Sequence, residues 1–182
     1  MKVLMLISNG FEEIEALGTV DVLRRLGVEV TTCSVTGLKK IISSRGIPIV
    51  CDKEVSDIYA DAALWDAVVL PGGQPNSNTL RDSEKVMEIV KDFASSGKLT
   101  CAICAAPIAL ERAGLLSGRK VTAYPGCLAC DGSYEYTGEK VVRDGNIITS
   151  KGPGTMYDFA FEIANALGLG NKLEELKAAM ML

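Results

Sequence analysis

Short apolar runs that alternate with helical patterns constrain the fold of this chain more than any other feature. Val3–Ile7 is continuously apolar and stops at Ser8-Asn9-Gly10, as expected of a strand that is buried on both faces. Further strands are expected at Val28–Cys33, Ala67–Leu70 and Leu99–Ile103. Apolar residues recur at helical spacing over Glu12–Leu26 and Ser83–Ala94. Strand–helix–strand units with short joints predict a mostly parallel sheet with helices on both faces.

Further segments complete this α/β expectation. Asp144-Gly145 is flanked by two short segments, Glu139–Val142 and Asn146–Thr149, and predicts an added β-hairpin. Pro48 makes Ile47–Val50 an edge strand, because proline cannot donate to a central ladder. Helices are expected at Ala105–Ala113, Thr155–Leu167 (with Thr155 as a cap) and Lys172–Met180. We therefore expect a single domain over residues 1–182.

Composition narrows the function classes. The 182 residues are 48% hydrophobic and 23% charged, with a formal net charge of −4. This mixture is typical of a globular protein and argues against nucleic acid as a partner. The chain has no His, so it lacks the commonest general base and metal ligand. The first apolar run is too short for a signal peptide or a membrane span, so we expect a cytoplasmic protein whose cysteines are thiols.

Cys104 stands where a buried run gives way to a helical pattern, as in a nucleophile elbow. Ala105 is small enough for a sharp turn, and Pro107 suits a first helical turn. The helix N-terminus predicts a thiol pKa below the ordinary value of about 8.5. The Gly72-Gly73 turn could aim a second backbone N–H at the same point, which with the N–H of Ala105 would form an oxyanion pocket. The alternative is a buried, inert thiol.

Glu15 is the candidate acid. Helix-dipole complementarity accounts for Glu12 and Glu13, whereas Glu15 lies on the same helical side as Val22 and Leu26. Burial there would favour the neutral carboxyl group. A neutral acid could donate a hydrogen bond to a nearby thiolate or oxidised sulfur, and an ionised one would repel it.

Two C-x-x-C pairs allow competing interpretations: Cys101 with Cys104, and Cys127 with Cys130. Their spacing suits a four-thiolate zinc module, but alternation along a strand sends Cys101 and Cys104 to opposite faces, so we assign no metal site. A second hypothesis makes Cys127 or Cys130 a resolving thiol that forms a disulfide with oxidised Cys104.

The ordered set of motifs resembles the ThiJ/PfpI family, in its DJ/ThiJ branch, over essentially the whole chain. The matching segments are Glu12–Ala16, Val20–Arg25, Val68–Gly73, Ala102–Pro107 and Thr149–Thr155. The resemblance implies a flavodoxin-like three-layer sandwich, a homodimer, no cofactor, and roles in oxidative-stress protection with glyoxalase or deglycase activity.

The resemblance also implies roles for individual residues. Cys104 matches the family's reactive cysteine and Glu15 its protonated partner. Gly73 and Ala105 match the oxyanion-binding amides. Gly72 matches the adjoining turn glycine, and Arg25 and Arg45 match basic residues near the pocket and dimer face.

One departure from the family limits the chemistry. Tyr124 stands where relatives often carry a His beside the pocket. A Cys–His dyad is therefore excluded, and protease activity is not expected. The leading hypothesis is cysteine-dependent glyoxalase or deglycase chemistry on a small reactive carbonyl. The alternatives are a redox sensor whose Cys104 reacts with an oxidant and, third, the zinc module.

Overall fold

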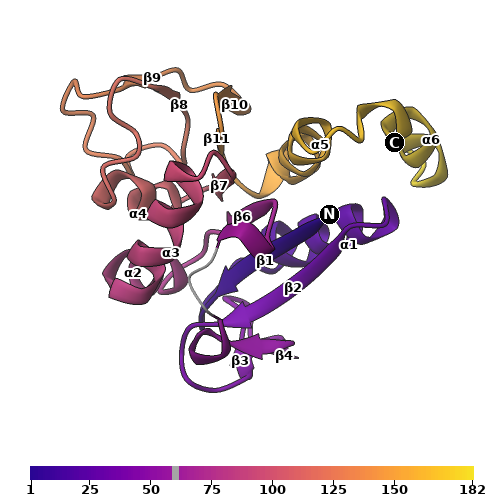
Figure 1. The fold of residues 1–182 in the computed structure, drawn as a ribbon, viewed down its shortest axis with the longest axis horizontal. Coiled ribbons are helices and arrows are strands. Elements are labelled where there is room, and N and C mark those ends of the chain that lie inside the picture. The colour runs from indigo at the N-terminus through magenta and orange to yellow at the C-terminus, as the bar shows by residue number, and fades with distance from the viewer. Residues whose placement is uncertain (59–61) are drawn as a thin grey trace.

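The protein, described here by a computed structural model over residues 1–58 and 62–182, is built on a seven-stranded sheet. Figure 1 shows its strands with helices beside them. Its strands are β1 (Lys2–Ile7), β2 (Glu29–Ser34), β5 (Lys53–Glu54), β6 (Ala67–Leu70), β7 (Leu99–Ile103), β10 (Val141–Asp144) and β11 (Ile147–Ser150). They lie in the order β10-β11-β7-β6-β1-β2-β5. The β10–β11 pair is antiparallel and the other pairs are parallel. The four expected strands of the main sheet and the hairpin are confirmed.

Two small two-stranded sheets lie outside the main sheet. β3 (Lys40–Ile42) pairs antiparallel with β4 (Pro48–Val50), so the expected edge strand forms, but in its own hairpin. β8 (Lys120–Val121) pairs in parallel with β9 (Glu135–Tyr136). The loop of the first hairpin returns to the start of the chain, because the N–H of Ser44 donates to the carbonyl of Phe11 at 2.8 Å.

The first helical segment differs from the expectation of one continuous helix. It consists of a π-helical turn, η1 (Ile14–Gly18), followed by α1 (Thr19–Arg25). A π turn inserts one extra residue per turn and often marks a functional site. Here it carries Glu15, which shows zero exposure.

The remaining helices are α2 (Asn76–Asp82), α3 (Glu84–Ser95), α4 (Pro107–Arg112), α5 (Met156–Ala166) and α6 (Leu173–Ala179), with 3₁₀ turns η2 (Val55–Asp57), η3 (Ala62–Leu64), η4 (Pro153–Thr155) and η5 (Gly170–Lys172). Ser83 caps α3 by accepting the N–H of Val86 at 3.3 Å. The expected cap at Thr155 is wrong, because its hydroxyl bonds to Gly152 and Ser150 instead.

The core has two halves, one on each face of the sheet. Along β1, Val3, Met5 and Ile7 pack into one half, while Leu4 and Leu6 pack into the other. α1 and α5 cover the first face, and α2, α3 and α4 cover the second (Figure 1). The expected three-layer α/β sandwich is therefore confirmed. Among the described residues, no helix has the length and apolar character needed to cross a bilayer.

Candidate functional site

Cys104 follows β7 directly and has a left-handed backbone, with φ of +64°. Few residues other than glycine adopt this region, and such strain concentrates at functional sites. Two backbone hydrogen bonds hold it: its N–H donates to the carbonyl of Ser150 at 2.9 Å, and its carbonyl accepts the N–H of Tyr124 at 2.8 Å. The residue is 9% exposed. This is the sharp strand-to-helix turn expected of a nucleophile elbow.

Glu15 lies against Cys104, with Gly72 between them. The Glu15 carboxylate accepts the N–H of Gly72 through Oε2 at 2.7 Å. A Cβ atom on Gly72 would stand 2.6 Å from the Cβ of Cys104 and 2.6 Å from Oε2 of Glu15. Only glycine fits this close approach, which explains the residue type at position 72.

Burial changes the acidity of Glu15. It raises the pKa of the carboxyl group to about 7, although the N–H of Gly72 and the Cys104 thiol act in the opposite direction. The other oxygen, Oε1, is buried and has no hydrogen-bond partner among the described residues. The expectation that burial favours the neutral acid is therefore supported.

The acidity of Cys104 departs from the expectation. Burial raises the pKa of the thiol, and the negative charge of Glu15 raises it further. The N–H groups of Ala105 and Gly73 lower it, but by less. The predicted depressed pKa is wrong in direction, because burial and a neighbouring carboxylate outweigh the amide donors. When Glu15 holds a proton, its repulsion of the thiolate is absent.

The two expected amide donors both act on Cys104, because the N–H groups of Gly73 and Ala105 each lower the pKa of its thiol. Their role in holding an oxyanion stays a prediction. Gly73 has φ of +87°, and a Cβ there would stand 2.4 Å from the nitrogen of Glu12 and the carbonyl oxygen of Gly10. The turn thus needs glycine for both conformation and space.

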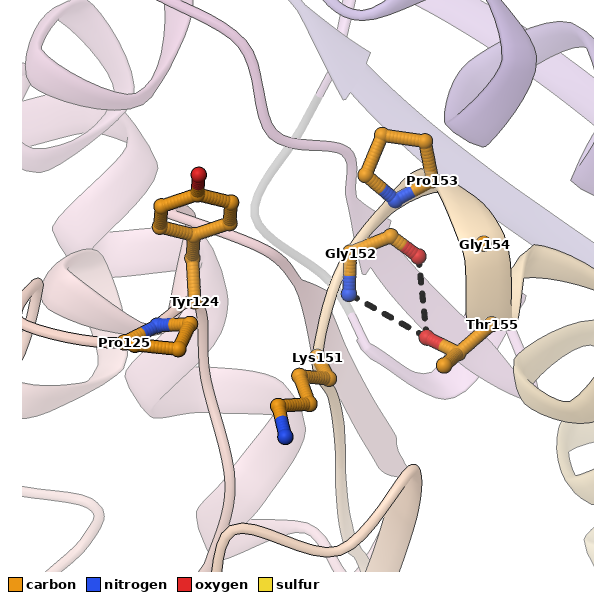
Figure 2. A pocket seen from close by; sticks show the side chains of 7 residues that line it. All are labelled: Tyr124, Pro125, Lys151, Gly152, Pro153, Gly154 and Thr155. Carbon is orange, nitrogen blue, oxygen red and sulfur yellow. Dashed lines mark hydrogen bonds between the residues drawn. The ribbon is translucent and has the colours of Figure 1, made fainter.

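A cavity of about 360 Å³ lies beside Cys104 and is lined by Tyr124, Pro125 and residues 151–155 (Figure 2). Tyr124 and Pro125 form one wall, and Gly152 and Pro153 face them. Cys104 is not itself a lining residue, but its backbone bonds to Tyr124 in one wall and to Ser150, which precedes the other. Tyr124 is 52% exposed, and it lies at the pocket as expected.

Neither Arg25 nor Arg45 lines the cavity beside Cys104. Arg25 ends α1, ten residues after Glu15, pairs with Asp21 at 2.8 Å, and lines a separate cavity with Lys172 and Glu175. Its role near the pocket and dimer face stays a prediction. Arg45 is exposed in the β3–β4 loop, which reaches the first loop through the bond of Ser44 to Phe11. Its role at the pocket stays a prediction.

The second cysteine pair does not form a metal site with the first. Cys101 is fully buried in the same half of the core as Cys104; the expected opposite faces are wrong, since Cys104 lies beyond the regular strand. Cys127 is half-buried and Cys130 is exposed. Within residues 1–58 and 62–182, no three Cys, His, Asp or Glu side chains are grouped to hold a metal ion. A resolving role for Cys127 or Cys130 stays a prediction.

Sequence reasoning missed Asn76, the first residue of α2. It shows zero exposure and bonds to three backbone groups at the ends of β1 and β6. α2 is short and has no apolar stripe that would predict it. The place of Asn76 shortly after the Gly72-Gly73 turn could have indicated a helix start, because Asn favours such positions.

A mostly parallel sheet with both faces covered and a strained cysteine beside a buried acid define the class of protein. The model of the DJ-1/PfpI family matches residues 1–166, and the chain belongs to that family. Protein dj-1beta of Drosophila melanogaster is 38% identical over 180 residues, which cover 98% of this chain and 95% of the relative. The Parkinson disease protein 7 homolog of Danio rerio is 35% identical over 184 residues, covering 100% and 97%.

Solved structures agree with this assignment. A mutant of a DJ-1 superfamily protein from Salmonella typhimurium superimposes with a TM-score of 0.92 at 36% identity, covering 99% of this chain and 97% of the other. Toxoplasma gondii DJ-1, described as oxidized, has a TM-score of 0.90 at 32% identity, covering 99% and 97%. The fold and the family expected from the sequence are confirmed.

Proposed function

We propose that this DJ-1-type protein defends against carbonyl and oxidative stress, and that Cys104 and Glu15 act on small reactive aldehydes without a cofactor. The observation that carries the proposal is the pairing of a strained cysteine with a buried acid across Gly72. We further propose that it acts in the cytoplasm as a homodimer, as the family resemblance implies.

Addition to the aldehyde uses the two side chains together. The sulfur of Cys104 attacks the aldehyde carbon, and the thiol proton passes to the Glu15 carboxylate. The carbonyl π electrons move to oxygen, which the N–H groups of Gly73 and Ala105 stabilise as an oxyanion. A carboxyl pKa of about 7 suits this exchange, because a group that titrates near the working pH can both accept and return a proton.

A glyoxalase-type cycle balances with water alone. With methylglyoxal, Glu15 returns the proton to give a hemithioacetal. Transfer of a proton from its carbon to the neighbouring carbonyl carbon, through an enediol, gives a thioester. Water then cleaves the thioester, releases lactate and restores the thiol. One carbon is oxidised while its neighbour is reduced, so no external oxidant or reductant is needed.

The second candidate is a redox sensor, favoured by the buried acid beside Cys104, which can hold a proton near neutral pH. The thiolate attacks one oxygen of a peroxide; the S–O bond forms, the O–O bond breaks, and water leaves. A second peroxide converts the sulfenate to a sulfinate. Protonated Glu15 donates a hydrogen bond to a sulfinate oxygen, which stabilises this state.

Purified protein incubated with methylglyoxal separates the two candidates. We expect lactate formation that Cys104→Ala abolishes and Glu15→Gln reduces at least a hundredfold, in the range of a lost general acid–base. Cys51→Ala removes a buried thiol beyond β4, outside the site, and serves as the control. If lactate does not form while peroxide adds two oxygens to Cys104 in peptide mass spectra, the sensor replaces the enzyme.

A further inference from the structure

The Pro71–Gly72–Gly73 turn presents two N–H groups to the reactive pair, and the backbone alone does not explain its orientation. The N–H of Gly72 donates to Glu15, and the N–H of Gly73 lies close enough to the Cys104 thiol to lower its pKa. Two successive glycines have a soft torsional surface. Rotation of either peptide unit would turn an N–H away from the site.

Asn76 supplies the missing constraint. Its side-chain Nδ2 donates to the carbonyl oxygens of Pro71 at 2.7 Å and Gly72 at 2.9 Å. Its Oδ1 accepts the N–H of Ser8 at 2.6 Å. The opposite amide orientation would aim an oxygen at two carbonyls and an NH₂ group at an N–H, so these partners determine the orientation present here.

Because peptide units are planar, the bonds from Asn76 to the two carbonyls also fix the direction of the two N–H groups. The carbonyl of Pro71 and the N–H of Gly72 belong to one planar unit and point in opposite directions, as do the carbonyl of Gly72 and the N–H of Gly73. Holding both carbonyls on the Asn76 side therefore holds both N–H groups on the opposite side. The N–H of Glu12 also donates to the Gly72 carbonyl at 3.0 Å and supports the second unit.

From this geometry we infer that Asn76 is a positioning residue: one buried carboxamide holds two successive peptide units so that their N–H groups face Glu15 and Cys104. The inference deepens the proposed function, on which its catalytic meaning rests. Asn76 touches neither Glu15 nor Cys104 through a hydrogen bond of its own; its bonds go to Ser8, Pro71 and Gly72.

The reactivity of Cys104 tests the inference without requiring turnover. Asn76→Leu keeps the approximate side-chain volume and removes the donors. Loss of one hydrogen bond to a charged group shifts a thiol pKa upward by about one unit. We therefore expect the iodoacetamide rate at Cys104, located by peptide mass spectrometry, to fall about tenfold at pH 8. The full pH profile of alkylation moves upward by the same amount.

Asn78→Leu is the matched control, because Asn78 has the same residue type in α2 but is exposed. It should leave the profile in place. Asn76→Ser, whose short hydroxyl supplies one donor at most, replaces Asn76→Leu if that variant fails to fold. A merely structural role would lower the melting temperature and leave the alkylation pH profile unchanged, and that result in a folded Asn76 variant overturns the inference.

The alkylation test of Asn76 and the lactate test of the proposed function can fail independently. If wild type forms no lactate but the Asn76 variants shift the alkylation profile, the positioning role stands and the enzyme proposal falls. If wild type forms lactate and an Asn76 variant matches it in both alkylation and turnover, the positioning role falls alone.

Discussion

Gly72 is the residue on which the geometry of the site depends most directly. Only its backbone lies between the side chains of Glu15 and Cys104, and there is no room for a Cβ atom. We predict that Gly72→Ala lowers the unfolding free energy by about 1–3 kcal/mol, as overpacking of a core does, and abolishes lactate formation. Denaturant unfolding and the methylglyoxal assay measure the two effects.

Gly154→Ala provides the comparison for stability, because a Cβ there meets no atom within 4 Å. Its unfolding free energy should stay within about 0.5 kcal/mol of wild type. Equal stability of Gly72→Ala and wild type would contradict the close approach of the three residues.

Glu15 makes stability depend on pH. Its folded pKa of about 7 lies above the ordinary value of 4.5, so the folded state binds the proton more tightly than the unfolded state. The resulting stabilisation is complete below pH 4.5 and is lost as the pH rises through 7. We predict that wild type loses about 3 kcal/mol relative to Glu15→Gln between pH 4.5 and 8. Parallel stability curves for the two proteins would refute the raised pKa.

Apolar spacing in the sequence predicted some of the strands and helices and missed others. Continuous apolar runs predicted β1 and β6, because strands buried on both faces leave little choice of residue. Partly apolar segments predicted β2 and β7. The π turn at η1 was not visible, since one extra residue in a helix barely alters the apolar spacing. α2 was missed because its buried positions include Asn76 and Ser77. Their side chains bond to backbone groups of the preceding turn and, for Asn76, also to Ser8.

The N-terminal cap of α3 makes a contribution to stability that can be measured. Ser83 accepts the N–H of Val86. Replacing it with Ala should cost about 1 kcal/mol of unfolding free energy. Ser96→Ala, at the other end of the same helix, should be nearly neutral, because its exposed hydroxyl caps no N–H. A cost below about 0.3 kcal/mol at Ser83 would show that the cap adds little.

At the scale of the whole molecule, the sheet order brings distant segments to one edge. The ends of β1, β6 and β7 are neighbours, so Glu15, Gly72 and Cys104 meet although 89 positions separate the first from the last. Sequence reasoning could therefore name these residues from strand ends alone. It could not give the balance of burial and charge on the thiol, which depends on the packed neighbours.

We also predict that the chain forms a homodimer. The proposed homodimer should sediment as a species of twice the 19.3 kDa chain mass. Several large apolar side chains are exposed on the single chain, among them Ile14, Ile42, Ile47 and Val50, and pairing would remove such surface from water. A monomer at micromolar concentration in sedimentation velocity would contradict it.

The central claim is that Glu15 holds a proton near neutral pH beside Cys104. A ¹³C NMR titration of the side-chain carboxyl of Glu15, assigned by comparison with Glu15→Gln, measures this directly. We expect a midpoint of about 7. A midpoint near 4.5, the ordinary value for an exposed glutamate, would contradict it.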